Sequence, residues 1–297
     1  MAVESRPTLA PAARAAESVA GASRAPAVAQ ASSRAQPPSR GRLVGVAGGL
    51  TGFILPAVLI AVWHVASVSG WIKPYILPPP ATVVTTLWDL TLNGTLAKHL
   101  QASVTRWTIG FMLGGGLGLL LGSWVGLSRG AERLLDTSIQ MLRTVPFLAM
   151  APLLIIWMGL DEAPKITLVG LAAFFPLYIN TFAGIRNVDR KLIEVGRVYG
   201  LSSAEMLARV IIPAALPAVF TGVRYGLGVA WLALVVAELM GATRGLGFML
   251  VEGREFVRID VIVGGILLFS VVGKLVDVFV RMLEAHFLRW RDTFAGG

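Results

Sequence analysis

Two arginines lie deep inside long apolar stretches, and their guanidinium groups are suited to binding an anion. Arg143 lies about nine residues into the stretch Leu134–Leu160, and Arg224 lies about ten residues into Ala214–Gly241. At 1.5 Å per residue, each would be roughly 14 Å from the same membrane surface. A charge at that depth costs at least about 2.5–3.5 kcal/mol unless it faces a cavity or a partner. The pattern fits an anion pathway, and it also fits a structural bond to helix carbonyls or to an acid.

The longest polar interval in the apolar second half, residues 189–213, has the features of an ordered surface element. Asp189 can cap a first helix, and Gly200 stands where a helix ends in the left-handed conformation. Ser202–Glu205 forms a capping box that begins a second short helix, which Pro213 is expected to stop. Two short helices, basic on their polar face, would give another protein a rigid surface to grip.

Glu194 lies in the last two turns of the first of these helices, where its negative charge opposes the helix dipole. It therefore needs a partner, either a nearby Arg190 or Arg197 or a group on another protein. These features alone are also compatible with an ordinary amphipathic helical loop.

The sequence carries no motif for catalysis. It has no phosphate-binding loop, since Gly273-Lys274 lacks both the earlier Gly and the following Ser or Thr. No nucleophile–His–acid set or pair of carboxylates stands out, and there is no Cys. The three His (His64, His99 and His286) lack metal-ligand spacing and are interpreted as interfacial or satisfied residues. We expect a protein that is not an enzyme and that uses no metal or cofactor.

The composition indicates a polytopic membrane protein. Of 297 residues, 55% are hydrophobic and only 14% are charged. The net charge of +9 reflects orientation in a membrane better than binding to nucleic acid, which we do not expect as a partner. We expect an all-α fold with about six transmembrane helices, because six apolar stretches are long enough to cross a bilayer. These are Leu43–Ser69, Val104–Leu127, Leu134–Leu160, Ile166–Ile185, Ala214–Gly241 and Val261–Ala285.

Small residues recur at helical spacing in two of these stretches. Glycines stand at every fourth position from Gly110 to Gly126, and Gly222, Gly226 and Ala230 form a second ridge. Such ridges let another helix backbone approach closely, so we interpret both as packing surfaces.

Outside the spans, Thr82–Leu92 is predicted to form an amphipathic surface helix, and Arg244–Asp260 to form a mixed loop. Lys274 and Asp277 are predicted to neutralise each other.

Basic residues set the predicted orientation. The N-terminal tail, the loops around Arg129 and residues 186–209, and the C-terminus hold roughly twice as many Lys and Arg as the alternate connections. Both termini and the Glu194 loop are therefore placed in the cytoplasm, although three Arg of the 244–258 loop then lie outside. Residues 1–42 are predicted to be a disordered cytoplasmic tail, and residues 43–292 the membrane domain.

The spacing of Glu194, Gly200 and Pro213 resembles the "EAA" signature of permease subunits of binding-protein-dependent ABC importers. Four positions depart from it: Val195 and Gly196 replace the two alanines, Val210 replaces the Ile and Ile212 replaces the Leu. The spacing of Glu, Gly and Pro is kept. Further segments resemble the aliphatic sulfonate permease branch, to which taurine, nitrate and bicarbonate permeases are closely related. This resemblance extends over residues from about 50 to 292. The segments are Glu132–Arg143 followed by Val145-Pro146, Tyr178–Thr181, Gly184–Asn187, Tyr199–Ser202, Gly222–Arg224 and Gly273–Leu275.

The resemblance implies a type I ABC importer permease, homodimeric and embedded in the lipid of the bacterial inner membrane. Its partners would be ABC ATPase subunits and a periplasmic sulfonate-binding protein, and its cargo an aliphatic sulfonate. Taurine, nitrate or a related small anion remains an alternative cargo. The residues implied to couple transport to the ATPase are Glu194, Gly200, Leu201, Ser202 and Pro213, with Arg143 and Arg224 as candidates for the anion path.

Two alternative functions, each from a different class of membrane protein, remain open. A six-span channel or facilitator without an ATPase would not need an ordered cytoplasmic helix pair. A scaffold subunit without a conducted substrate would not need charges at mid-membrane depth.

The topology can be tested with labels at single positions. We expect labels at Gln30 and at Ser202 to react from the cytoplasmic side and a label at Glu162 to react from outside, because basic residues favour the cytoplasm. Labels at Gln30 and Ser202 on opposite sides would mean an odd number of spans between them and would contradict the predicted orientation.

Overall fold

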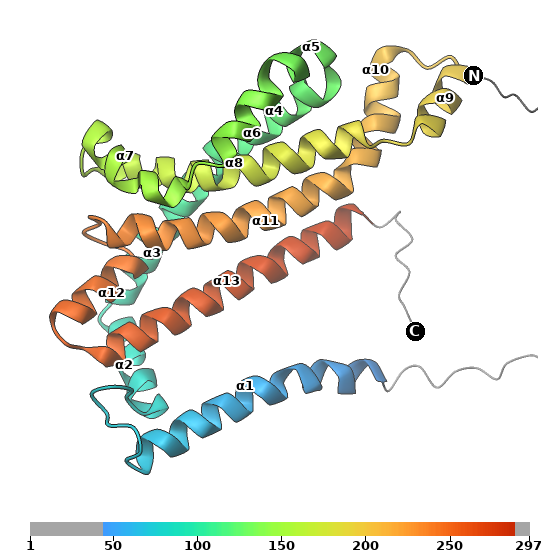
Figure 1. Ribbon diagram of the computed structural model, residues 1–297. Coiled ribbons are helices and arrows are strands. Elements are labelled where there is room, and N and C mark those ends of the chain that lie inside the picture. Colours follow the sequence, from blue (N-terminus) through green and yellow to red (C-terminus); the bar gives the residue numbers. More distant parts are fainter. Residues whose placement is uncertain (1–43, 289–297) are drawn as a thin grey trace, which may run out of the picture. The chain divides into compact units, whose positions relative to one another are not determined.

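The computed structural model describes residues 44–288, and every regular element in that range is a helix (Figure 1). The expectation of an all-α protein is confirmed for these residues. Residues 1–43 and 289–297 lie outside the described part, so the tail predicted over residues 1–42 stays a prediction. The chain divides into residues 1–53 and residues 54–297, and every contact and site described below lies in the second unit.

The helices and the short π and 3₁₀ segments between them follow one another in this order: α1 (Val44–Val68), α2 (Pro80–Leu92), α3 (Thr95–Gly110), π segment η1 (Phe111–Gly115), α4 (Gly116–Leu127), α5 (Arg129–Ala131), π segment η2 (Glu132–Asp136), α6 (Thr137–Arg143), 3₁₀ segment η3 (Phe147–Met150), α7 (Ala151–Met158), α8 (Glu162–Arg186), α9 (Arg190–Val198), α10 (Ser203–Met206), π segment η4 (Leu207–Ile211), α11 (Ile212–Leu239), α12 (Leu246–Glu255) and α13 (Ile259–Phe287).

In the described part of the chain, four continuous helices are long and apolar enough to cross a membrane. They are Thr95–Leu127, Glu162–Arg186, Ser203–Leu239 and Ile259–Phe287. A fifth candidate is a bent pair, Arg129–Arg143 with Phe147–Met158, and the apolar α1 precedes them all. These six elements correspond to the six predicted stretches.

The predicted span Leu134–Leu160 is wrong as one continuous helix. Its two halves, which end at Arg143 and begin at Phe147, are bent by 79°. Pro146 causes the break, because it has no N–H to donate and keeps the preceding residue out of the helical region. The side chain of Thr144 bonds the carbonyl of Met141 at 2.7 Å and so satisfies one end of the interrupted helix.

The prediction that Pro213 stops the second short helix is also wrong. The chain is helical from Ser203 to Leu239, and Pro213 lies in the first turn of α11. The preceding turn, Leu207–Ile211, is a π-helix, whose wider hydrogen-bond pattern accommodates a residue that lacks an N–H. The short helix is therefore joined directly to the spanning helix.

Two boundaries also differ from the prediction. The second spanning helix begins at Thr95 rather than at Val104. A hydropathy pattern misses its first turns, because their residues are polar. The expected loop over Arg244–Asp260 contains α12. Both polar segments contact each other in the site described below.

The glycine ridge of α3–α4 packs directly on the backbone of α8. A Cβ at Gly114 would overlap the carbonyl of Gly170, and one at Gly118 would overlap that of Phe174. At Gly122 the nearest atom would be the Tyr178 carbonyl oxygen, 2.7 Å away. The interpretation of this ridge as a packing surface is confirmed.

The second ridge brings α11 against the same helix, so α8 runs between α4 and α11 (Figure 1). A Cβ at Gly222 would lie 2.8 Å from Cβ of Asn180 and 3.1 Å from the Pro176 carbonyl oxygen. Ala230 is fully buried in the core that these helices share. In a membrane, where apolar contact with lipid is equally available, such close packing is what holds helices together.

Gly114→Ala should destabilise the protein, because the methyl group would force α4 away from α8; overpacking of this kind costs about 1–3 kcal/mol. Gly116→Ala is the matched control, since a Cβ there meets nothing within 4 Å. Thermal unfolding of the detergent-solubilised protein should show a lower midpoint for Gly114→Ala only. Equal midpoints for the two variants would contradict the packing analysis.

Candidate functional site

The helix pair α9–α10 has the local geometry that its sequence predicts. The Asp189 side chain accepts from the N–H of Lys191 at 2.9 Å, which caps α9. At the other end Gly200 is left-handed, with φ of +71°, and the N–H of Leu201 bonds the carbonyl of Gly196 at 3.0 Å. This is a Schellman turn, in which a glycine ends one helix and redirects the chain.

The second helix of the pair starts at the predicted capping box. Ser202 Oγ accepts from the N–H of Glu205 at 3.3 Å, and the Glu205 carboxylate accepts from the N–H of Ser202 at 3.0 Å. Met206 then packs on Gly196, where a Cβ would lie 2.7 Å from the Met206 methyl carbon. The two helices are thus fastened to each other by caps at the turn and by one buried contact.

The outer face of α9 is apolar and exposed. Leu192 and Val195 are about half exposed, at 49% and 52%, and Val198 and Tyr199 are 86% and 81% exposed. Glu194 is exposed on the same helix and forms no ion pair with any residue in 54–288. An exposed apolar face on a rigid helix pair is typical of a protein–protein contact.

The two candidate pathway arginines have different surroundings. Arg224 on α11 forms an ion pair with Glu284 on α13, the bond to an acid that the sequence left open. Arg143 ends α6, is exposed, and forms no ion pair within the described part of the chain. It lines a groove between the α6–α7 break and the α8–α11 seam, and Arg224 does not line that groove. The two guanidinium groups therefore do not share one groove.

The predicted pair of Lys274 and Asp277 is present on α13, at 3.5 Å. Arg281 is nearer to the same carboxylate, at 2.8 Å. The three charges form a surface network, which supports the structural interpretation.

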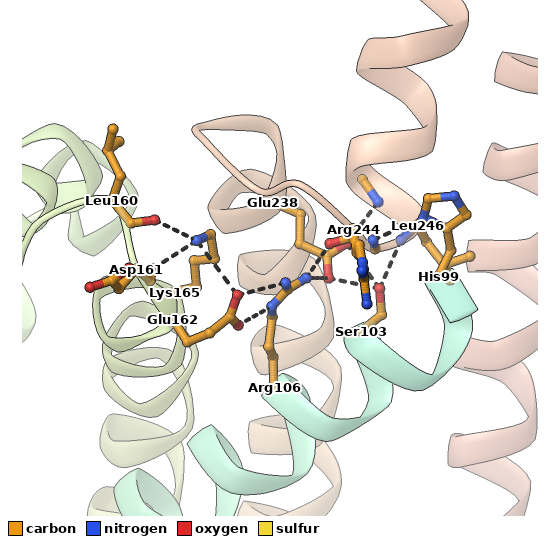
Figure 2. A network of polar contacts seen from close by, with 12 residues as sticks. His99, Ser103, Arg106, Leu160, Asp161, Glu162, Lys165, Glu238, Arg244 and Leu246 are labelled. Atoms are coloured by element: carbon orange, nitrogen blue, oxygen red, sulfur yellow. Dashed lines mark hydrogen bonds and ion pairs between the residues drawn. The ribbon is translucent and has the colours of Figure 1, made fainter. Parts of the chain in front are cut away.

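A buried polar network joins α3, α8, α11 and the turn before α12 (Figure 2). At its centre is Glu238, of which 1% is exposed. Its carboxylate accepts from Ser103 Oγ at 2.7 and 2.9 Å, from Arg106 Nη1 at 2.8 Å and from the N–H of Gly247 at 2.7 Å. A buried carboxylate needs a paired charge and hydrogen-bond donors, and Glu238 has both.

Arg106 connects two carboxylates that come from different helices. Its Nε and Nη2 donate to Glu162 at 2.5 and 2.8 Å, and Nη1 donates to Glu238 and, at 2.5 Å, to the carbonyl of Arg244. Arg106 is 5% exposed, whereas the Glu162 side chain is 54% exposed. The guanidinium on α3 thus fastens the first turn of α8 to the last turns of α11.

The same network satisfies the N-terminal end of α12. The N–H of Gly245 donates to His99 Nδ1 at 3.1 Å, and that of Leu246 donates to Ser103 Oγ at 2.8 Å. Gly245 has φ of +133°, and a Cβ there would overlap the Glu238 carboxyl group. Free N–H groups at a helix start favour a nearby negative charge, so the helix itself stabilises the buried carboxylate. His99 is a satisfied residue, as expected.

The sequence contains one local signal for this network. Glu238 is the only acid in the predicted span Ala214–Gly241, and an ionisable group at such a position has a partner. That the partner is Arg106, 132 residues earlier, could not be read from spacing.

The network and the helix pair lie at opposite ends of the two central helices. Glu162 begins α8 and Glu238 is the second-last residue of α11. The pair α9–α10 instead follows the C-terminus of α8 and precedes α11. Any force on the helix pair therefore reaches the network through α8 and α11.

Comparison with known proteins assigns the chain to a family. Residues 114–289 match the family described as the binding-protein-dependent transport system inner membrane component. The chain belongs to this family. It is thus an inner-membrane component of a transport system, and the expectation that it is not an enzyme is confirmed.

Two relatives of this permease share about half of the aligned residues with it. Two permease proteins named for the transport of aliphatic sulfonates (SsuC) are each 51% identical to it. The one from Bacillus subtilis aligns over 84% of this chain and 90% of its own length, and the one from Escherichia coli over 82% and 92%. The taurine transport system permease protein TauC of Escherichia coli is 38% identical over 79% of this chain and 87% of its own length.

The fold of the permease is that of a solved transporter. A chain of the MetNI methionine ABC transporter in an inward-facing conformation superposes with a TM-score of 0.51 and 19% sequence identity. The superposition covers 68% of this chain and 98% of that chain. The predicted ABC importer permease fold is confirmed.

In this permease, the Arg106–Glu238 network is a clamp at the end of the bundle opposite the helix pair. Glu238→Gln should destabilise the permease strongly, because it leaves Arg106 with one charge partner fewer inside the protein. Breaking a buried pair costs about 3–5 kcal/mol. Glu255→Gln is the control, since Glu255 is exposed and forms no ion pair among the described residues. A thermal midpoint for Glu238→Gln equal to that of the control would show that the clamp is not structural.

Proposed function

We propose that this chain is the translocation subunit of an ATP-driven importer that carries aliphatic sulfonates across the bacterial inner membrane. The observation that carries the proposal is the 51% identity, over more than four fifths of the chain, with two permeases named for that cargo. The taurine relative is 38% identical and a nitrate import permease of Synechocystis is 34% identical. Taurine and nitrate are therefore the weaker candidates.

The partner at the cytoplasmic side is a pair of ABC ATPase subunits, which the permease contacts through α9–α10. The exposed apolar face around Leu192 and Val198 supports this assignment. Gly200 and Leu201 form the turn that fixes the pair, and Ser202 caps its second helix. Because Glu194 has no ion pair among the described residues, it is free to bind a cation on the ATPase.

Pro213 has a related role in this proposal. It follows the π turn through which α10 continues into α11. A movement of the helix pair therefore passes into a spanning helix without a flexible joint. A six-span channel without an ATPase would have no need for this connection, which is why we favour a transporter.

The proposed orientation also indicates where the binding protein would contact the permease. With α9–α10 and both termini in the cytoplasm, the Arg106–Glu238 clamp faces the periplasm, where a sulfonate-binding protein would deliver its cargo. The permease would act as a homodimer, with the path between its two copies.

Uptake by the complete transporter tests the cargo. Proteoliposomes that contain the permease, its ATPase and its binding protein should accumulate an alkanesulfonate when supplied with ATP, and nitrate should not compete. Nitrate uptake without sulfonate uptake would overturn the assignment. Sulfonate uptake that continues without ATP or ATPase would indicate a facilitator.

Gly200→Val should uncouple ATP hydrolysis from transport while insertion remains intact. A left-handed residue with a side chain costs about 1–2 kcal/mol, and more when it is β-branched, so the turn between α9 and α10 would change shape. We expect ATPase stimulation by loaded binding protein to be lost, together with uptake. Glu194→Ala should have the same effect through its lost contact.

Gly94→Val is the matched control for the strain. Gly94 has φ of +73° and, like Gly200, no atom within 4 Å of an added Cβ, but it lies in the turn between α2 and α3. It should keep full stimulation. If Gly200→Val also keeps full stimulation and uptake, α9–α10 is not the coupling element.

A further inference from the structure

The break between α6 and α7 opens a groove of about 360 Å³ beside the seam of α8 and α11. Backbone that is not helical at membrane depth is stable only where it is buried in protein or lines a cavity. The break at Thr144–Pro146 meets that condition, because residues on both sides of it line the groove. The lining residues are Arg143, Phe147, Ala172, Phe175, Pro176, Ile179, Asn180, Tyr225 and Val229.

One part of the lining can bind an anion. The Arg143 guanidinium has no ion-pair partner within residues 54–288, and no acidic side chain lines the groove. Tyr225 is 63% exposed and offers a hydroxyl. Asn180 uses one amide N–H on the Pro176 carbonyl, at 2.8 Å, which leaves its second N–H. Three kinds of donor are thus available to the three oxygens of a sulfonate.

The remaining lining is apolar. Phe147, Phe175, Ile179 and Val229 supply aromatic and aliphatic surface next to Arg143. A bare inorganic anion would leave this surface unused. A molecule with an anionic head and a short alkyl chain would use both parts, and a chain that ends in an ammonium group would place a charge against apolar side chains.

A second hollow lies next to the groove, on the side toward the C-terminal end of α8. This hollow, of about 550 Å³, shares Asn180 with the groove and continues along the same seam between α8 and α11. Its lining is small or polar and extends to Asn187, which immediately follows α8, close in sequence to α9. A substrate held at Arg143 would therefore lie next to this second hollow, which extends toward α9.

We propose that this groove is the substrate subsite of the permease and that it selects alkanesulfonates by length. The sulfonate group binds Arg143, Tyr225 and Asn180, and the alkyl chain lies on Phe147 and Phe175. Arg224 takes no part, because Glu284 already occupies it. The inference rests on the proposed function and adds a selection step within the membrane.

Uptake of methanesulfonate and butanesulfonate by the complete transporter in proteoliposomes tests the proposal, with the binding protein saturated by each. Each buried methylene strengthens binding about fourfold. Phe147→Ala should therefore lower butanesulfonate uptake about tenfold relative to methanesulfonate uptake. Phe279→Ala is the control, because Phe279 is 57% exposed on α13 and does not line the groove.

The head group is tested with milder variants. Tyr225→Phe removes only a hydroxyl and should reduce uptake of both sulfonates by the same factor of several-fold. Arg143→Gln should abolish both, and Arg143→Lys should restore part of the uptake. Arg133→Gln is the control, since Arg133 is also exposed and unpaired within the described range but lies outside the groove. Copurification of the ATPase confirms assembly of each variant.

Two results would overturn the subsite while leaving the proposed function intact. In one, Phe147→Ala lowers the uptake of both sulfonates equally. In the other, assembled Arg143→Gln transports normally. A wild-type transporter that imports another anion and no sulfonate would instead refute the proposed function itself.

Discussion

The structure depends on the close approach of two helix backbones to α8. Glycines of α3–α4 and of α11 bring their carbon atoms against α8 carbonyls, and Gly114 and Gly222 leave no room for a side chain. In lipid, helices gain little from hiding apolar surface, since the surrounding chains are equally apolar. Dispersion contacts at short range must therefore hold the bundle together, and only the smallest residues allow them.

This packing makes α8 and α11 a rigid unit with a different device at each end. At one end the Arg106–Glu238 clamp ties both helices to α3 and to the start of α12. At the other end the capped pair α9–α10 joins them, and the π turn before Pro213 makes the connection to α11 continuous. A displacement imposed at the helix pair can thus be transmitted along the length of the membrane domain.

Three arginines of the membrane domain differ in their surroundings. Arg106 has its donors used by two carboxylates and a carbonyl, and Arg224 is paired with Glu284. Arg143 has no such partner among the described residues, and it lies where a broken helix opens a groove. Because its guanidinium has no acidic partner among the described residues, Arg143 is the arginine available to a ligand in the proposed subsite.

Much of the α9–α10 helix pair could be predicted from the sequence, because its hydrogen bonds join near neighbours. Asp189 and Lys191, Gly196 and Leu201, and Ser202 and Glu205 are at most five residues apart. Hydropathy likewise located the spans, and the four-residue period of glycines predicted helix contacts. In each case the interacting or repeating residues lie within one or two helical turns of each other, so their spacing in the sequence is enough to predict the structure.

Other features were decided by the tertiary structure. Pro146 breaks a helix and Pro213 does not, because only the second is preceded by a π turn at the start of a packed spanning helix. Arg143 and Arg224 looked alike in the sequence, yet within residues 54–288 only Arg224 meets an acid, 60 residues away on α13. Glu238 and Arg106 are 132 residues apart. Partners so distant along the chain are chosen by how helices pack, and no local pattern records that choice.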